Sequence, residues 1–423
     1  MSKEIKLNLS IESVLSFLIV IYFFFYEHIQ SLISYNSASV LCVFNIGLAL
    51  LVVVKNFRLH SGIGIALPWV LVILLSLYRN HILINQMYWI SFWNYISAFI
   101  VAFSLIKSAD FEWFDTLVKT AKFCGLCYVL TTLAMVIIPG LGSIQYTMWG
   151  YYPNGTENGT YSYRAGLATN YSANGIYIAL TLIIFFISII SDINLKKRIK
   201  KSDIFYVTIS AAALLFTTKR AHLLFAVSAL VICFLLIRKS SAWVKFTKLL
   251  GVGVLALLAF SIVSYFVPAL MSTFDRFFNE SGDISTGRYV LWEYALDEYH
   301  KNPILGIGWF GFRFQQLNFT YSAGYYDVHC IYIQLLCEVG IIGLILVVFA
   351  MVFSWFKTLI LIKKRSEKMP EYCYSALTIS LVIQTFMILY GITSNVLYDR
   401  CFIIYILSIA VEWSVEYMMR TKQ

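Results

Sequence analysis

The chain has 423 residues, of which 60% are hydrophobic, 17% aromatic and only 13% charged, with a mean hydropathy of +0.76 and a net charge of +10. A soluble globular protein carries roughly 25% charged residues, so this composition excludes that class and predicts a polytopic membrane protein. Eight cysteines are scattered along the chain, nearly all within apolar runs, where packing is their expected role.

Membrane-spanning helices need about 20 mostly apolar residues, with a usual range of about 17–25. We expect about twelve such spans, at residues 14–26, 38–54, 63–77, 88–106, 121–138, 172–191, 204–218, 221–237, 249–267, 330–356, 374–391 and 401–415. No small-residue cleavage site follows the first run, which is therefore predicted to be a retained span. The expected fold is all-α, with residues 1–423 forming a single integral membrane domain.

The basic residues are unevenly divided between the segments that join these spans. With a cytoplasmic N-terminus, 23 of the 32 Lys and Arg residues fall on the cytoplasmic side and nine fall outside. This division follows the positive-inside rule and predicts that both termini are cytoplasmic. It also explains the basic net charge as topology, without a nucleic-acid partner.

The type of basic residue differs between the two sides. Eighteen of the 23 cytoplasmic cations are lysine, whereas seven of the nine outside cations are arginine. The planar guanidinium group matches phosphate or carboxylate with two hydrogen bonds, which lysine cannot do. The difference indicates an anion site on the outer side, with chance in a small sample as the alternative interpretation.

Two long segments are predicted to be extracytoplasmic loops, at residues 139–171 and 268–328. An amphipathic helix is expected in the second loop, ending at Asn302-Pro303. We expect this helix to lie on the membrane surface. Its apolar face would carry Leu291, Trp292, Ala295, Leu296 and Tyr299, and its acidic face Glu293, Asp297 and Glu298.

Two polar stretches share a spacing in which ten residues separate an arginine from a glycine. The first stretch runs from Arg164 to Gly175 and the second from Arg313 to Gly324. Arginine is costly near a bilayer, so its placement beside membrane spans calls for an anionic partner.

Other candidate residues lie where spans begin or end. Lys219 and Arg220 occupy a tight turn between two spans, with His222 just behind them, and would bind an anion or anchor the turn at the interface. Arg288 opens the amphipathic helix, where a cation is unfavourable unless an anion compensates. His329 precedes a span and is a candidate general base, although a lone histidine is often structural.

The pattern GxGxxG at residues 306–311 does not predict a dinucleotide site, because no βαβ unit surrounds it. These glycines are expected to let the loop turn and approach the membrane face closely. The outside acidic residues form no Asp-x-Asp pair and no cluster with metal-ligand spacing. We therefore expect a metal-independent reaction that uses no cofactor.

Several short motifs follow one another in this order: Gly287-Arg288, Trp292, Asn302-Pro303-Ile-Leu-Gly306-Ile-Gly308, His329 and Gly340-x-x-Gly343. The order resembles the O-antigen polymerase (Wzy) and O-antigen ligase superfamily, most strongly over residues 220–343. The paired Arg-x10-Gly stretches resemble those of polymerases, and the His-x10-Gly-x-x-Gly frame is similar to that of ligases. Ligases usually have Asn, Ser or Gln after this histidine, where the present chain has Cys330.

The resemblance implies a glycosyltransferase of the bacterial inner membrane, with a lipid-carrier-dependent (GT-C-like) architecture. Its donor and acceptor would be glycans linked to undecaprenyl pyrophosphate. Membrane lipid, a chain-length regulator and a flippase would be its other partners. A polymerase would join repeat units into O-antigen or capsular polysaccharide at the outer face of the membrane.

For a polymerase we expect catalytic roles for Arg220, Arg288 and His329. The two arginines would hold the donor pyrophosphate, and the histidine would accept a proton from the acceptor hydroxyl, which attacks the anomeric carbon with inversion. The expected substrate-binding residues are Arg164, Arg313, Lys219, Gly175 and Gly324.

Three alternatives remain, of which a structural membrane scaffold would not need seven arginines on the outer side. An O-antigen ligase would transfer the finished polysaccharide to lipid A core. A flippase or other transporter would place charges inside its spans near the membrane midplane. The span interiors of this chain are expected to be nearly free of charge, which favours an enzyme over a transporter.

Overall fold

The computed structural model describes most of the chain outside several intervening segments. The described residues are 10–33, 35–55, 69, 71–72, 86–106, 112–151, 155–237, 240–241, 243–247, 250–251, 253–254, 261, 265, 287–312, 327–364, 369–398 and 400–421. Most of the expected spans 63–77 and 249–267 lies outside this set, as do Arg313 and Gly324.

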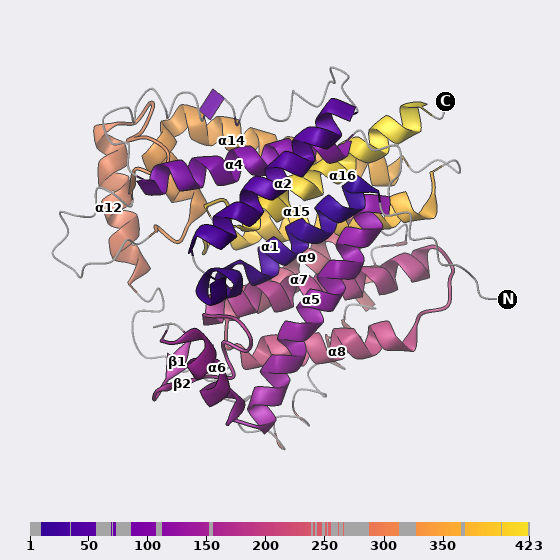
Figure 1. The fold of residues 1–423 in the computed structure, drawn as a ribbon. Coiled ribbons are helices and arrows are strands. Elements are labelled where there is room, and N and C mark those ends of the chain that lie inside the picture. The colour runs from indigo at the N-terminus through magenta and orange to yellow at the C-terminus, as the bar shows by residue number, and fades with distance from the viewer. Residues whose placement is uncertain are drawn as a thin grey trace.

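Helices make up nearly all of the described secondary structure (Figure 1). They are α1 (Ile11–Ile33), α2 (Tyr35–Lys55), α4 (Gln86–Ile106), α5 (Glu112–Ile137), α6 (Leu141–Trp149), α7 (Tyr171–Asn194), α8 (Lys201–Phe216), α9 (Arg220–Ile237), α12 (Arg288–Lys301), α14 (Ile331–Lys363), α15 (Glu371–Tyr390) and α16 (Cys401–Thr421). Among the described residues, seven helices are long and apolar enough to cross a membrane. The prediction of an all-α, multi-pass membrane protein is therefore confirmed.

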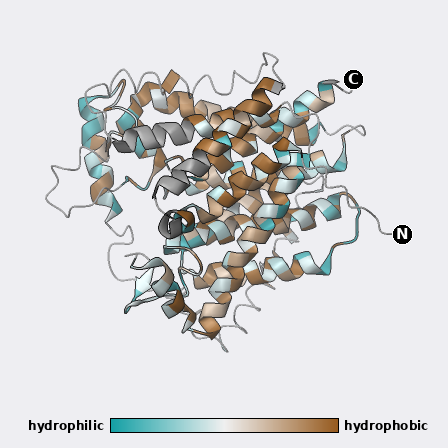
Figure 2. Ribbon diagram, in the orientation of Figure 1, coloured by the Kyte–Doolittle hydropathy of each residue, from teal (hydrophilic) through white to brown (hydrophobic). Residues whose placement is uncertain are grey.

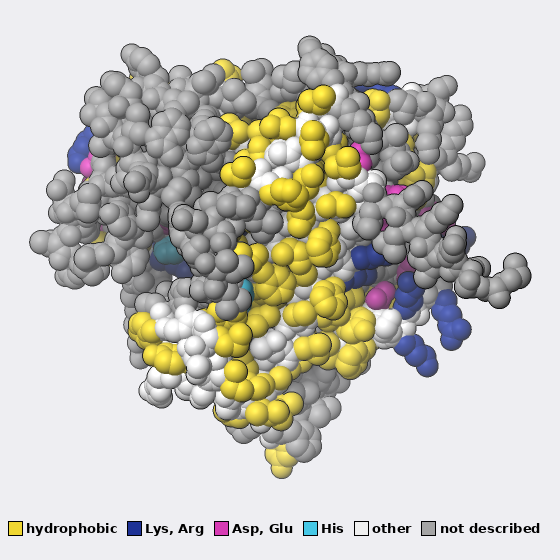
Figure 3. All heavy atoms as spheres, viewed as in Figure 1, with side chains coloured by type: hydrophobic (Ala, Val, Ile, Leu, Met, Phe, Trp, Pro, Cys, Tyr) yellow, Lys and Arg dark blue, Asp and Glu magenta, His cyan; other side chains and the backbone are white. Residues whose placement is uncertain are grey.

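The hydropathy of the helices is arranged as a membrane requires. Apolar residues fill the middle of the long helices, whereas polar residues gather at their ends and on α12 (Figure 2). Many large apolar side chains also face outwards and form a broad band on one face (Figure 3). Phe123 is 70% exposed and Phe349 is 61% exposed. Side chains of this kind are suited to contact lipid rather than water.

Segments that the sequence assigns to the same side of the membrane meet at the same end of the helices. Glu27, near the C-terminal end of α1, forms an ion pair of 2.5 Å with Arg400, just before α16. The neighbouring His28 contacts the carbonyl of Leu167 at 2.7 Å. Segments assigned to the other side meet elsewhere, as in the ion pair between Lys197 and Glu371. Which of these two ends faces the cytoplasm stays a prediction.

The loop at 139–171 contains structure that the sequence did not predict. It holds α6 and a small antiparallel hairpin of β1 (Thr156–Glu157) and β2 (Thr160–Tyr161). Gln145 in α6 donates a hydrogen bond of 3.0 Å to the carbonyl of Ala168. Figure 1 shows this small subdomain at the same end of the long helices as α12.

A helix is present where the sequence predicts one in the second loop: α12 ends at Lys301, directly before Asn302-Pro303. One part of the prediction is wrong, because Glu298 does not lie on an exposed acidic face. Glu298 is buried, and Lys301 pairs with it at 2.6 Å. The helix packs against α14, and this contact covers the side chain that a helical pattern alone assigns to solvent.

The expectation that span interiors are almost free of charge is also wrong in two places. Glu338 in α14 and Glu412 in α16 are both fully buried. Glu412 pairs with Lys357 at 3.1 Å and accepts a hydrogen bond of 2.9 Å from Thr358. A buried charge is tolerated only with partners of this kind, which an apolar sequence pattern does not reveal.

The glycines of the 306–311 motif allow the chain to approach α14 closely, whereas their expected approach to the membrane face stays a prediction. Ile307 and Gly308 donate backbone hydrogen bonds of 3.0 and 2.7 Å to the carbonyls of Cys337 and Glu338. Immediately beyond this contact α14 is kinked at Gly340, which has φ +65° and ψ −172°. A Cβ atom at Gly340 would lie 2.2 Å from the carbonyl oxygen of Ile304.

Gly340→Ala is therefore expected to lower the stability of the protein. The strained backbone alone costs about 1–3 kcal/mol, and the collision with the backbone at Ile304 adds to this loss. Thermal unfolding of the purified protein in detergent would measure the effect. Gly47→Ala is the matched control, because nothing lies within 4 Å of a Cβ atom at Gly47, in α2. Equal melting temperatures of the two variants would contradict this role of Gly340.

Candidate functional site

The first pair of candidate cations lies at the tight turn between α8 and α9. α8 ends at Phe216, and α9 begins only four residues later, at Arg220. Thr218 adopts a positive φ of 55° in this turn, and the backbone N–H of Lys219 donates to the Thr217 hydroxyl at 3.3 Å. Both cations are thereby held at the N-terminus of a helix, where an anion is favoured and a cation is not.

Arg288 is the first residue of α12, and it is half-buried. Burial lowers the pKa of its guanidinium group, and the positive charge of Arg220 lowers that pKa further, whereas Tyr390 acts in the opposite direction. Among the residues that the structure describes, no carboxylate forms an ion pair with Arg288. Two guanidinium groups thus lie near each other at the starts of two helices, an arrangement that suits an anionic ligand.

Tyr390, the last residue of α15, joins this pair to a buried histidine. Its hydroxyl forms a hydrogen bond of 2.8 Å with Nε2 of His222, and the ring centroids lie 4.6 Å apart. Lys219 and Arg288 are both within electrostatic reach of this imidazole. The His222 side chain therefore lies near Lys219, Arg220 and Arg288, the three residues that form the cationic cluster.

Gly175 has a different place from the one expected for a substrate-binding residue. It is buried within α7, and a Cβ atom there would lie 3.1 Å from the ring of His222. Its contribution is therefore indirect, because the missing side chain leaves room for the imidazole that contacts Tyr390.

Arg164 approaches the cluster from the loop at 139–171. Its guanidinium group pairs with Glu157 at 3.0 Å and lies 4.3 Å from the ring centroid of Tyr171. Lys219 approaches the same ring, with Nζ at 5.8 Å from the centroid. The Tyr171 hydroxyl donates a 2.8 Å hydrogen bond to Glu157. Arg164 and Lys219, distant in sequence, thus meet at one tyrosine, and Glu157 offsets part of their charge.

His329 lies beside the chain that follows α15. The side-chain amide of Asn395 is 3.5 Å from Nδ1 of His329, at the outer limit for a hydrogen bond. The backbone N–H of Ile331 donates to the carbonyl of Gly391 at 2.9 Å. Tyr390 and Asn395 are only five residues apart, so the C-terminal end of α15 and the chain after it contact both His222 and His329.

The structure therefore brings together most of the predicted site residues that it describes. Sequence reasoning missed four contributors, namely Glu157, Tyr171, Tyr390 and Asn395. Tyr171 and Tyr390 lie at the ends of apolar runs, where interfacial tyrosine is common, so their type and position gave no signal. Within the described part of the chain, no group of three or more His, Cys, Asp or Glu side chains could hold a metal ion. Independence of a metal stays a prediction.

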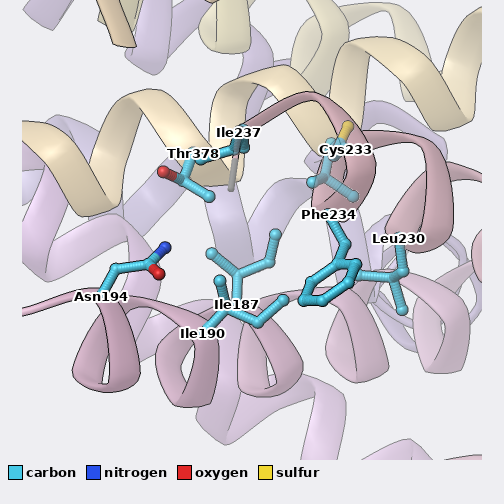
Figure 4. A pocket seen from close by; sticks show the side chains of 9 residues that line it. Ile187, Ile190, Asn194, Leu230, Cys233, Phe234, Ile237 and Thr378 are labelled. Carbon is cyan, nitrogen blue, oxygen red and sulfur yellow. The ribbon is translucent and has the colours of Figure 1, made fainter. Parts of the chain in front are cut away.

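A separate apolar recess lies between α7, α9 and α15 (Figure 4). Its lining contains no charged side chain, so it is unsuited to a pyrophosphate group. The lining residues are Ile187, Ile190, Asn194, Leu230, Cys233, Phe234, Ile237, Thr378 and Val382. The recess therefore does not form part of the cationic site.

A protein-family model matches part of the chain. Residues 205–348 match the family model described as O-antigen ligase, and this segment contains Arg220, Arg288 and His329. No curated protein matches the chain. The segment 205–348 of this multi-pass membrane protein is thus similar to the O-antigen ligase family, which confirms the resemblance to the O-antigen polymerase and ligase superfamily.

Proposed function

We propose that the protein is a glycosyltransferase that polymerises undecaprenyl-pyrophosphate-linked repeat units into O-antigen or capsular polysaccharide. The observation that carries this proposal is the place of Arg220 and Arg288 at the starts of α9 and α12, where the charge of Arg220 lowers the pKa of Arg288, with no ion-paired carboxylate on Arg288 among the described residues. Repulsion between two guanidinium groups is relieved when a dianionic group such as a pyrophosphate lies between them.

In the proposed reaction, Arg220 and Arg288 hold the pyrophosphate of the donor lipid. They stabilise the negative charge that develops on it as the bond to the sugar breaks, which is the largest single source of catalysis in many enzymes. Lys219 and Arg164 extend the positive surface towards Tyr171. Arg313 and Gly324, outside the described residues, remain proposed substrate-binding residues.

His329 is proposed to act as the general base. It accepts the proton of the acceptor hydroxyl while that oxygen attacks the anomeric carbon from the face opposite the leaving group. The electron pair of the broken C–O bond leaves with the lipid pyrophosphate, so the configuration at the anomeric carbon is inverted. A group positioned in this way contributes about 10²–10⁴-fold to a rate.

The proposal includes an orientation in the membrane. The end of the bundle with Arg220, Arg288 and His329 would face the periplasm, and both termini would lie in the cytoplasm of a bacterial cell. About twelve spans in a single GT-C-like membrane domain and two extracytoplasmic loops, 139–171 and 268–328, complete this topology. The partners would be lipid-linked glycans, membrane lipid, a chain-length regulator and a flippase, and nucleic acid is not among them.

The second candidate is an O-antigen ligase that transfers polysaccharide to lipid A core. It is favoured by the description of the matching family model. A flippase is a third candidate, supported by the buried carboxylates Glu338 and Glu412. The cationic cluster lies at one end of the bundle rather than at its middle, which favours the transferases.

A gene deletion separates these candidates. Loss of a polymerase should leave a single repeat unit attached to core, because the separate ligase still acts on the unpolymerised unit. Loss of a ligase should leave core with no repeat unit, while lipid-linked polymer accumulates. Loss of a flippase should leave lipid-linked units on the cytoplasmic side. Electrophoresis of lipopolysaccharide and extraction of lipid-linked glycans distinguish the outcomes, and the first one is expected here.

A further inference from the structure

Glu338 is a buried carboxylate that receives hydrogen bonds but no ion pair within the described part of the chain. It lies in α14, two residues before the kink at Gly340. The backbone N–H of Phe310 donates to one carboxylate oxygen at 2.8 Å, and that of Phe312 donates to the other at 3.2 Å. Burying a carboxylate is costly, so such a group is retained where its acceptor capacity is needed.

Gln334, one helical turn earlier, connects Glu338 to the chain before His329. Its side-chain N–H groups donate to Glu338 and to Asp327, each at 3.2 Å. Its side-chain oxygen accepts a hydrogen bond of 3.2 Å from the backbone N–H of Val328. The amide nitrogen and the amide oxygen of Gln334 are therefore both hydrogen-bonded. Because Glu338 accepts from the nitrogen, it fixes the orientation of the amide.

Two strained residues flank this network. Phe310 has a φ of +63° and His329 a φ of +56°, values that residues other than glycine rarely adopt. Such conformations persist only when the surrounding structure holds them, and they cluster at functional sites. Phe310 is held directly by Glu338. His329 is held through Val328, whose carbonyl also accepts a 2.9 Å hydrogen bond from the indole of Trp292.

We infer that Glu338 is a positioning residue for the reaction, acting through Gln334 and Val328 on the place of the His329 imidazole. The inference rests on the proposed function, in which His329 is the general base. A shift of about 1 Å in a reacting group can cost about a hundredfold in rate, so a network that holds a strained backbone at this residue has a direct effect on chemistry. Binding of the donor at Arg220 and Arg288 does not depend on it.

The variant Glu338→Gln tests the inference. Both carboxylate oxygens accept backbone N–H groups, so an amide NH2 in place of either oxygen faces a donor and breaks the network. Polymerisation of lipid-linked repeat units by the purified protein is expected to show kcat reduced about a hundredfold, with KM for the donor unchanged. Adding Glu338→Gln to His329→Ala is expected to cause no further loss of kcat.

Glu412→Gln is the matched control, because Glu412 is an equally buried carboxylate whose partners lie in another network. It is expected to lower the melting temperature and to leave kcat unchanged. Trp292→Phe is a milder second variant, which keeps the aromatic packing and removes only the indole N–H donated to Val328. It is expected to lower kcat at a normal protein level, even where Glu338→Gln does not reach the membrane.

Three results would overturn the inference while leaving the proposed function intact. One is a normal kcat in both Glu338→Gln and Trp292→Phe when His329→Ala is inactive. Another is an equal loss of kcat in Glu338→Gln and Glu412→Gln. The third is a further loss when Glu338→Gln is added to His329→Ala. Full activity of His329→Ala would instead remove the proposed base, and the inference with it.

Discussion

Replacing Arg288 with alanine is expected to abolish long polysaccharide chains, with a fall in polymerisation rate on the order of a thousandfold. The guanidinium group is half-buried, starts α12 and lies near Arg220. Its removal leaves the developing charge on the pyrophosphate without one of its two proposed partners. The measurement is polymer length and initial rate with lipid-linked repeat units, at matched protein levels in the membrane.

Two further variants refine this prediction. Arg288→Lys keeps the charge but loses the planar pair of donors, so an intermediate loss of rate is expected. Arg420→Ala is the control, because Arg420 is exposed, pairs with Glu416 one turn earlier in α16, and lies at the other end of that helix from Cys401. Full-length polymer from Arg288→Ala, or an equal defect in Arg420→Ala, would contradict the proposed role of Arg288.

The second large effect is expected at His329. His329→Ala should reduce kcat by about 10²–10⁴-fold, because the acceptor hydroxyl loses the group that takes its proton. The donor should still bind, since the proposed pyrophosphate site is formed by Arg220 and Arg288. Single-turnover rates and donor affinity, measured on the same purified protein, separate these two quantities.

His300→Ala provides the comparison, because His300 is an exposed histidine in the last turn of α12. Its kcat and its affinity for the donor are expected to equal those of the unaltered protein. If His329→Ala retained a normal kcat, the acceptor hydroxyl would have to lose its proton to another group. Asn395 could not supply that function, because an amide is not a base at neutral pH.

Much of the fold could be predicted because the membrane imposes simple rules on sequence. Apolar runs of sufficient length marked the long helices that the structure describes, and the distribution of lysine predicts which loops share a side. The end of α12 followed from Asn302-Pro303, since proline cannot continue a helix. These features depend on local sequence or on the bilayer, and no tertiary contact was needed to recognise them.

The details of the site depend on contacts between distant segments, and these were not predictable. Arg164 was expected to bind an anionic ligand, but Glu157 in the hairpin of β1 and β2 forms an ion pair with it. The residues around Tyr390 do not predict its contact with His222, which is 168 residues away in the sequence. Glu338 lay within an apolar run and was overlooked, because its donors come from residues 310–312. Spacing alone cannot show which surfaces a helix meets.

The most direct test of the proposed pyrophosphate site measures donor binding. The purified protein in lipid nanodiscs would be titrated with a repeat unit linked to undecaprenyl pyrophosphate and, separately, with the same glycan on uncharged undecaprenol. We predict strong preference for the charged lipid, weakened in Arg220→Ala and in Arg288→Ala and abolished when both are replaced. Equal affinity for the two lipids, or an unchanged preference in the double variant, would contradict the assignment of these arginines to the pyrophosphate.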